Sequence, residues 1–160
     1  MIESDVYVME GSLLPFQEAG IPFETYPVAY DLLNWGEDER MLVITTGTVW
    51  GAVHFRAEEL ASEPPLDLIS WEEMQEVSVN FRSDNVKLLD LEETQKETFP
   101  DVSLISNPGL YRVRVYAVGR HSGIDMQQVG EHLDERYLMQ LWGESKARPS
   151  TPVQTIGDRN

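Results

Sequence analysis

The chain has 160 residues and no cysteine, and its 28 Asp and Glu against 12 Lys and Arg give a net charge of −16. This length suits a single domain with its own core, and the missing cysteines exclude disulfides, thiolate metal sites and a cysteine nucleophile. Phosphate backbones and anionic lipids repel so acidic a chain, so we expect neither direct nucleic-acid binding nor membrane binding.

In chain order, the first feature is an acidic start, Met1 to Asp5, where a signal peptide would be basic. No apolar run approaches the roughly 20 residues that span a bilayer. We therefore expect a cytoplasmic protein. Residues 5–10 and 28–33 are candidate strands. Residues 41–46 predict a buried strand that turns at Gly47 and returns as a second strand over 49–56.

Residues 57–62 could form one helical turn before Pro64 and Pro65. The segment 71–81 starts ambiguously but ends in the alternation Val77, Val79, Phe81, which is typical of a strand. A turn over 83–85 leads to a short partner strand at 86–89.

The clearest strand covers 111–118, where Tyr111, Val113, Val115 and Ala117 share one face and Arg112, Arg114 and Tyr116 share the other. Residues 137–142 predict its hairpin partner and the end of the fold. Short strands separated by turn residues indicate a mostly β fold, an antiparallel β-sandwich or jelly-roll-like fold with little helix. We expect one domain over 1–145 and a flexible tail over 146–160.

No motif for catalysis or for a cofactor is present. The histidines His54, His121 and His132 have no flanking nucleophile motif, and the acid runs lack the order of a calcium loop. No glycine-rich phosphate loop occurs. We predict no catalytic residue, no metal site and no cofactor, although paired carboxylates cannot be selected without geometry.

The arginines of 111–118 and the tryptophans are candidate binding residues. Arg112 and Arg114 could read an anion, but cross-strand pairing with neighbouring acids is the favoured interpretation. Three of the four tryptophans have strand-like surroundings and are expected in the core: Trp50, Trp71 and Trp142. Trp35 lies among acidic loop residues and is the best candidate for an exposed anchor.

The order of several motifs resembles small bacterial β-sandwich proteins and, more distantly, the competence-nuclease inhibitor family. The resemblance covers about residues 41–142 and depends on four segments: 46–53 (TGTVWGAV), 71–78 (WEEMQEVS), 109–120 (GLYRVRVYAVGR) and 135–142 (ERYLMQLW). Members of that family bind and silence a DNA-degrading partner. The resemblance implies a β-sandwich and a non-catalytic inhibitory role, with no catalytic residue to carry over.

Three functions follow from these observations. The first is an acidic inhibitor, immunity-type or phage anti-defence protein that blocks a basic nuclease, toxin or nucleic-acid-binding enzyme. The second is a structural module that forms homo-oligomers, with acid only for solubility. The third is an enzyme or a small-ligand pocket between the sheets. The first predicts these partner-binding residues: Trp35, Glu37, Asp38, Glu39, Glu72, Glu73, Glu76, Asp90, Glu92 and Glu93.

Overall fold

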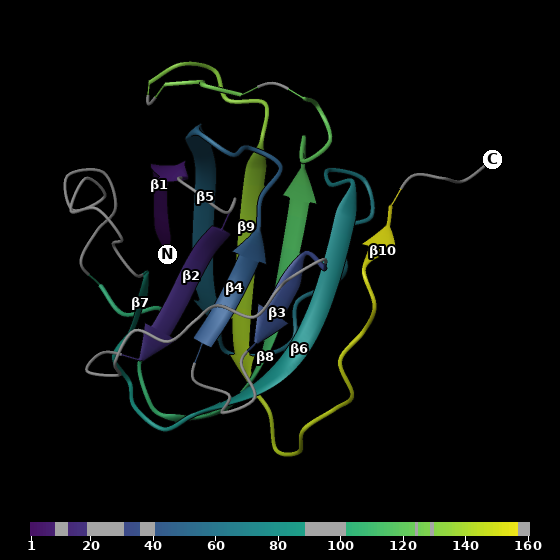
Figure 1. Ribbon diagram of the computed structural model, residues 1–160. Helices are drawn as coiled ribbons and strands as arrows, with labels where there is room; N and C mark the ends of the chain where they lie inside the picture. The colour runs from purple at the N-terminus through teal and green to yellow at the C-terminus, as the bar shows by residue number, and fades with distance from the viewer. Residues whose placement is uncertain are drawn as a thin grey trace.

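The computed structural model describes residues 1–8, 13–18, 31–35, 41–88, 102–123, 125–128 and 130–156. Within these residues the chain is mostly β and forms ten strands without a helix (Figure 1). The strands are β1 (Ile2–Val8), β2 (Leu13–Glu18), β3 (Leu33–Trp35), β4 (Met41–Thr45), β5 (Gly51–Leu60), β6 (Glu73–Phe81), β7 (Val86–Leu88), β8 (Gly109–Val118), β9 (Arg136–Gly143) and β10 (Gln154–Thr155).

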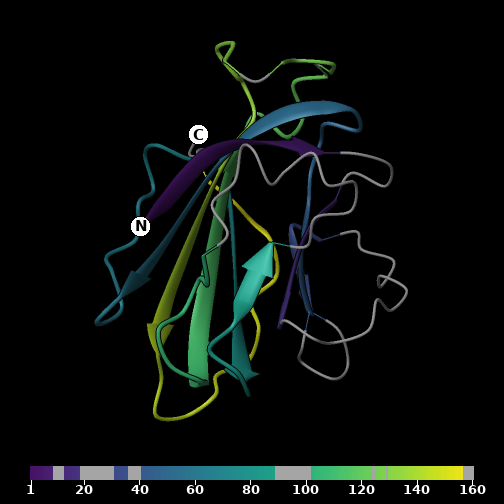
Figure 2. The same ribbon diagram turned by 90° about the vertical axis from the view of Figure 1, so that its left-hand side faces the viewer.

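The strands form two sheets, which Figure 2 shows as separate layers. The larger sheet has six strands in the order β1-β5-β9-β8-β6-β10, and the smaller has four in the order β3-β4-β2-β7. Neighbouring strands are antiparallel except β5 and β9, which run parallel from the pair His54↔Arg136 to the pair Leu60↔Trp142. The mostly β fold with little helix that the sequence predicts is confirmed for the described residues, and the parallel pair β5–β9 makes the larger of its two sheets mixed.

The core lies between the two sheets and follows from the alternation along the strands. Val113 and Val115 of β8 are fully buried beside residues of β6, as their period-2 spacing predicts. Phe16 of β2 and Phe55 of β5 stack across the two layers with ring centroids 5.1 Å apart. The side chain of Gln75 also faces inward, where its Oε1 accepts the Leu33 N–H of β3 at 2.7 Å.

The predicted hairpin of β8 with β9 is confirmed, because Val113 faces Leu141 in an antiparallel register. Two other predicted pairings are wrong. β4 and β5 belong to different sheets, and β7 pairs with β2 instead of β6. The residues proposed as a helical turn over 57–62 instead extend β5 as far as Leu60.

Contacts at the connections explain why the chain changes sheets. A Cβ at Gly47 would lie only 1.8 Å from the carbonyl oxygen of Arg120. Because glycine has no side chain, the backbone of the β4–β5 connection can pack directly against the loop that contains Arg120. Between β6 and β7, Glu18 of β2 accepts the backbone N–H groups of Arg82 and Ser83. That contact holds the turn beside β2, and β7 then joins the small sheet.

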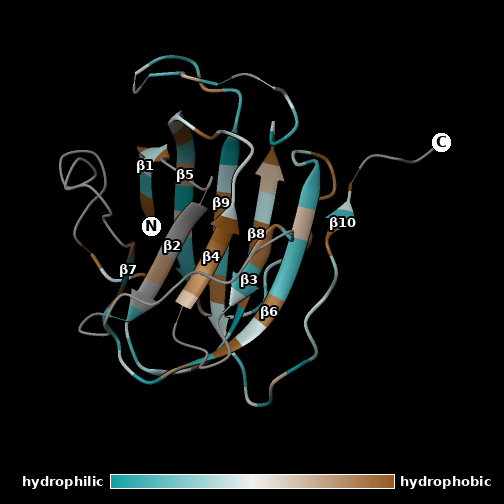
Figure 3. Ribbon diagram, in the orientation of Figure 1, coloured by the Kyte–Doolittle hydropathy of each residue, from teal (hydrophilic) through white to brown (hydrophobic). Residues whose placement is uncertain are grey.

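Among the described residues, no helix is long and apolar enough to cross a membrane. Hydropathy alternates along the strands of the larger sheet, as Figure 3 shows by the change from brown to teal along β8 and β9. The inward positions build the core, and the outward positions carry most of the ionic groups described below.

Candidate functional site

Arg112 and Arg114 lie on the outer face of the six-stranded sheet, turned away from the small sheet. Their side chains are only 3 % and 1 % exposed. Cross-strand pairing with acid is confirmed, since both contact Glu76 on neighbouring β6. These pairs are buried because two chain segments cover this half of the face: residues 61–72 and residues 144–156.

The guanidinium of Arg112 has a partner for each of its nitrogens. Its Nε donates to Glu76 Oε1 at 3.1 Å, and its Nη1 donates to Ser78 Oγ at 3.1 Å. Its Nη1 and Nη2 also donate to the backbone carbonyls of Arg148 and Pro149 at 3.2 and 3.1 Å. This arginine therefore ties the C-terminal segment to the sheet.

Arg114 ties the other covering segment to the same sheet. Its Nη1 donates to the carbonyl of Pro64 at 3.0 Å, and its Nη2 reaches Glu63 at 3.4 Å. Its Nε lies 3.5 Å from Glu76 Oε2, an ion contact without hydrogen-bond geometry. The guanidinium also lies over the ring of Trp142, 4.9 Å from the centroid.

Residues 144–156, most of the segment expected to be a flexible tail, lie along β6. Thr151 exchanges hydrogen bonds with Glu76: its N–H donates to the Glu76 carbonyl, and its Oγ1 accepts the Glu76 N–H. β10 pairs with the start of β6, and the Ile156 N–H donates to the Glu72 carbonyl. The domain boundary expected at 145 is therefore corrected: the packed chain continues to Ile156.

One end of the sandwich holds a hollow of about 370 Å³, whose lining includes Gly47, Val49, Arg120, His121, Asp125 and Glu135. Beside it, Arg120 Nη1 donates to both carboxylate oxygens of Glu73 at 3.0 and 3.1 Å. The ring of His121 is 75 % exposed, with its Nε2 3.3 Å from the same carboxylate. The lining of the hollow thus combines charged side chains with apolar surface.

Glu135 is a buried carboxylate that organises this end of the fold. It accepts the backbone N–H groups of Gly47 and Thr48 at 2.6 and 2.8 Å, the Thr48 hydroxyl at 2.5 Å and the Tyr137 hydroxyl. Burial, and then the charge of Glu135, raises the pKa of Tyr137 well above its ordinary value of 10.0. The phenol therefore stays protonated and remains a donor to Glu135.

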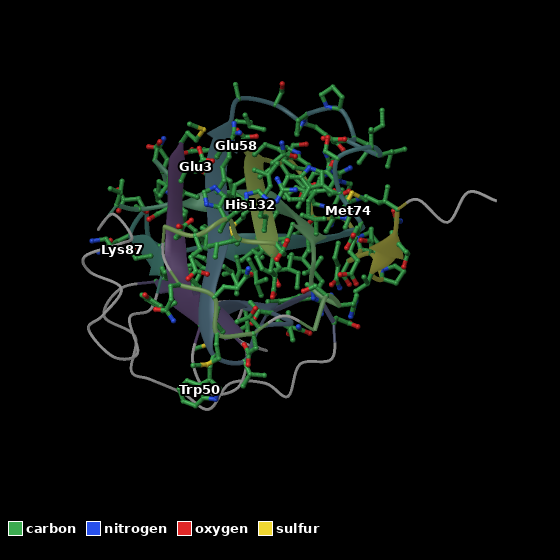
Figure 4. The ribbon with its side chains drawn as sticks, turned by 90° about the horizontal axis from the view of Figure 1, so that it is seen from above. Glu3, Trp50, Glu58, Met74, Lys87 and His132 are labelled. Carbon is green, nitrogen blue, oxygen red and sulfur yellow. The ribbon has the colours of Figure 1, made fainter. Side chains whose placement is uncertain are left out.

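The uncovered half of the outer face, over β1 and β5, carries an ionic cluster around His54. The His54 Nδ1 lies 2.7 Å from Asp5, and its Nε2 lies 2.9 Å from Glu3. Burial lowers the pKa of His54, but the hydrogen bonds to Asp5 and Glu3 together raise it by more, so the pKa lies above its ordinary value of 6.5. Figure 4 shows Glu3 and Glu58 close together on this side and Trp50 at the opposite side.

The residues selected from the sequence for partner binding are separated by the fold. Glu73 and Glu76 are each 8 % exposed and form the internal ion pairs described above, which corrects their assignment to a free acidic surface. Glu72 is exposed, although its carboxylate accepts the Gly119 N–H. Six members of the set lie outside the described residues: Glu37, Asp38, Glu39, Asp90, Glu92 and Glu93.

The tryptophans divide differently from the sequence expectation. Trp142 is buried, as predicted. Trp50, expected in the core, is 40 % exposed at the connection between β4 and β5. Trp35, the candidate exposed anchor, is half-buried and packs against the core cluster from β3.

Leu66, Leu68 and Ile69 in the β5–β6 connection are exposed apolar residues that the sequence motifs do not mark as a site. A signal was present: an apolar run follows Pro64 and Pro65 and cannot be a strand interior so close to them. In the described chain this run lies on the acidic exterior, where exposed large apolar side chains mark candidate contact sites.

The described residues form no group of three or more His, Asp or Glu side chains placed to hold a metal ion. The buried carboxylates of Glu73, Glu76 and Glu135 each accept hydrogen bonds from the chain itself, and these contacts hold the surrounding strands and connections in place. What this arrangement does chemically is to hold an acidic surface and one apolar loop in a fixed position.

Comparisons with known proteins add little to this geometry. No protein-family model matches the chain, and no curated protein matches it. A solved structure described as Crocagin biosynthetic gene J is similar with a TM-score of 0.45 and 14 % identity, covering 89 % of this chain and 97 % of that chain. At this level of similarity the neighbour gives no argument about the residues or activity of this chain.

Proposed function

We propose that the protein is a non-catalytic acidic binding protein that occupies a basic surface of a protein partner. The kind of partner that fits is a nuclease or another nucleic-acid-binding enzyme, whose cleft must be cationic to hold phosphates. In this reading the protein acts as an inhibitor or immunity-type protein. An acidic surface accelerates the encounter with such a cleft and competes with its nucleic acid.

The observation that supports this proposal is the arrangement of charge. Three arginines are taken into internal contacts with acids, Arg112, Arg114 and Arg120, and their side chains are at most 9 % exposed. Their partners Glu73 and Glu76 are buried with them, so these internal charges largely cancel. The net charge of −16 is therefore carried mainly by other groups, and among the described residues Glu3, Glu72 and Asp84 are exposed acids that a cationic partner could contact.

The proposal is tested by retention on the immobilised protein. Lysate from the source cell is applied at about 50 mM and about 500 mM salt, because screening at the higher concentration weakens an electrostatic encounter. We expect a basic nucleic-acid-binding protein to be retained at low salt only, and the purified partner to lose nuclease activity when this protein is added. Retention indifferent to salt, or no basic protein retained, would contradict the proposal.

Two matched triple variants locate the acidic contact. Glu37, Asp38 and Glu39 are reversed to Lys in one variant, and Asp90, Glu92 and Glu93 in the other, so both change the charge equally. Reversing the charge of the cluster that faces the partner should slow association by about tenfold or more, whereas reversing the other cluster should slow it less. Equal small effects of both variants would exclude both clusters as the contact.

A further inference from the structure

The connection between β5 and β6 exposes three large apolar side chains to solvent. Ile69 is 94 % exposed, Leu66 is 50 % exposed and Leu68 is 41 % exposed. In Figure 3 this stretch is brown beside the start of β6 and near β10. Large apolar side chains left in water do not gain the free energy of burial, so a cluster of this kind is a candidate contact surface.

The connection is held in place by contacts along its length. Arg114 Nη1 donates to the carbonyl of Pro64, the Asp67 N–H donates to the Tyr116 hydroxyl at 3.0 Å, and the ring of Trp71 stacks on Tyr116 with centroids 5.7 Å apart. These contacts attach the loop to the outer face of the large sheet. A loop ordered before binding loses little entropy on binding.

Within the loop a local turn fixes the most exposed residue. The Asp67 carboxylate accepts the N–H groups of Ile69 and Ser70, both at 3.0 Å. The hydrogen bonds from Ser70 and then Ile69 lower the pKa of Asp67, so this carboxylate is ionised at neutral pH. The turn thereby presents Ile69 to solvent next to a negative charge.

Carboxylates also border the apolar residues along the chain. Glu63 lies just before the two prolines and is 48 % exposed, and Glu72 lies just after Trp71 and is exposed. With Asp67 they place three acids among the ten residues from 63 to 72, a stretch that contains no Lys or Arg. Glu63 contacts Arg114 and Arg148, each at 3.4 Å, so its charge is largely compensated within the protein. The surface is thus apolar at its centre, with the carboxylates of Asp67 and Glu72 at its border.

We propose that residues 63–72 are the docking surface for a basic protein, with Leu66, Leu68 and Ile69 as apolar contacts and Asp67 and Glu72 facing its Lys and Arg side chains. This proposal rests on the proposed function and adds the place of contact. Charge complementarity selects the occupant. A second copy would bring another charge of −16 to the same face, whereas a basic partner is attracted to it.

The probes for the test are two synthetic peptides of equal length and charge. One consists of lysine and leucine, and the other has serine in place of leucine. Amide resonances of the ¹⁵N-labelled protein are followed by NMR during titration at about 50 mM salt. We expect the lysine–leucine peptide to shift the resonances of residues 63–72 and to bind about tenfold or more tightly than the lysine–serine peptide.

Variants separate the apolar contact from general attraction. The double variant Leu66→Ser with Ile69→Ser should remove the preference for the lysine–leucine peptide and leave the spectrum otherwise folded. Val102→Ser is the matched control, because Val102 is 50 % exposed near the β7 side of the small sheet. This control should retain the preference unchanged.

Each other result overturns the inference in a distinguishable way. If both peptides bind equally and the double variant binds like the native chain, the docking surface is refuted and the acidic binding function stands. If neither peptide binds, both proposals fail. If light scattering shows a dimer that dissociates in the double variant, the surface belongs to a second copy instead.

Discussion

Glu76 is the residue on which the outer face of the large sheet depends most. Its two carboxylate oxygens contact different arginines, Arg112 through Oε1 and Arg114 through Oε2. Each arginine in turn holds a separate covering segment through backbone carbonyls. Both guanidinium groups are buried, and Glu76 is the anion that they share, while Arg114 also contacts Glu63.

Replacing Glu76 with Gln therefore should lower the free energy of unfolding by about 3 kcal/mol, since it leaves two buried cations with one anion fewer. Urea denaturation followed by tryptophan fluorescence measures this. The matched control is Glu131→Gln, the same change at an exposed position, which should alter stability by less than about 0.5 kcal/mol. Equal stability of the two variants would show that the buried network contributes little.

His54 makes stability depend on pH. Burial lowers the pKa of this histidine in the folded protein, but hydrogen bonds to Asp5 and Glu3 outweigh that effect and raise the pKa above 6.5. The protonated ring therefore stabilises the fold. This contribution is complete below the unfolded pKa and is lost as the pH rises through the folded pKa. The free energy of unfolding of the native protein should therefore be higher than that of the His54→Gln variant, and this difference should be larger at about pH 6 than at about pH 8.5.

Urea unfolding of both proteins at the two pH values checks this, with His132→Gln as the control for an exposed histidine. The control should show no comparable change between the two pH values. A stability difference for His54→Gln that grows with pH would mean that the neutral ring is the stabilising form.

At the scale of the strand, alternation in the sequence predicts faces but not neighbours. For β8 the alternation separated the core positions Val113 and Val115 from Arg112 and Arg114 correctly. It could not show that the arginine face is covered, because the covering chain is 61–72 and 144–156. These segments have no periodic pattern of their own and are held by backbone carbonyls.

Pairing between strands was predicted where the connection is simple and missed where a distant residue controls it. The β8–β9 pairing was predicted from two strong strands. The β4–β5 and β6–β7 connections were read as hairpins, but Glu135 and Glu18 hold their backbones through side chains far away in the sequence. Turn residues such as Gly47 indicate where the chain bends, not which sheet it enters next.

The C-terminal segment gives a prediction at the same scale. A chain ending at Gly143 loses the carbonyls that accept from Arg112, the backbone partner Thr151 and β10. Leaving a buried cation without these acceptors should lower the free energy of unfolding by about 2–3 kcal/mol. Chemical denaturation of the truncated and full-length proteins measures the difference.

A chain ending at Ile156 is the control, because it keeps every contact of the segment described here. It should match the full-length protein in stability. If the chain ending at Gly143 is equally stable, residues 144–156 contribute no more than the flexible tail that the sequence alone suggests.

For the whole molecule, composition predicts the sign of the net charge but not the position of a contact. The count of acids over residues 1–110 cannot separate Glu73 and Glu76, which pair internally, from Glu72, which is exposed. Likewise Trp35 and Trp50 exchange their expected environments. Charge is additive along a sequence, whereas exposure depends on which distant segments cover a side chain.

The net charge predicts how salt acts on the isolated protein. Like charges at the surface repel each other more in the compact state than in the expanded chain, so a charge of −16 opposes folding. Salt shortens the range of this repulsion from about 30 Å at 0.01 M to about 8 Å at 0.15 M. The buried pairs of Glu76 with Arg112 and Arg114 are screened much less, so their contribution is retained. The urea midpoint should therefore rise as sodium chloride increases over this range, and a falling midpoint would mean that exposed attractive pairs outweigh the repulsion.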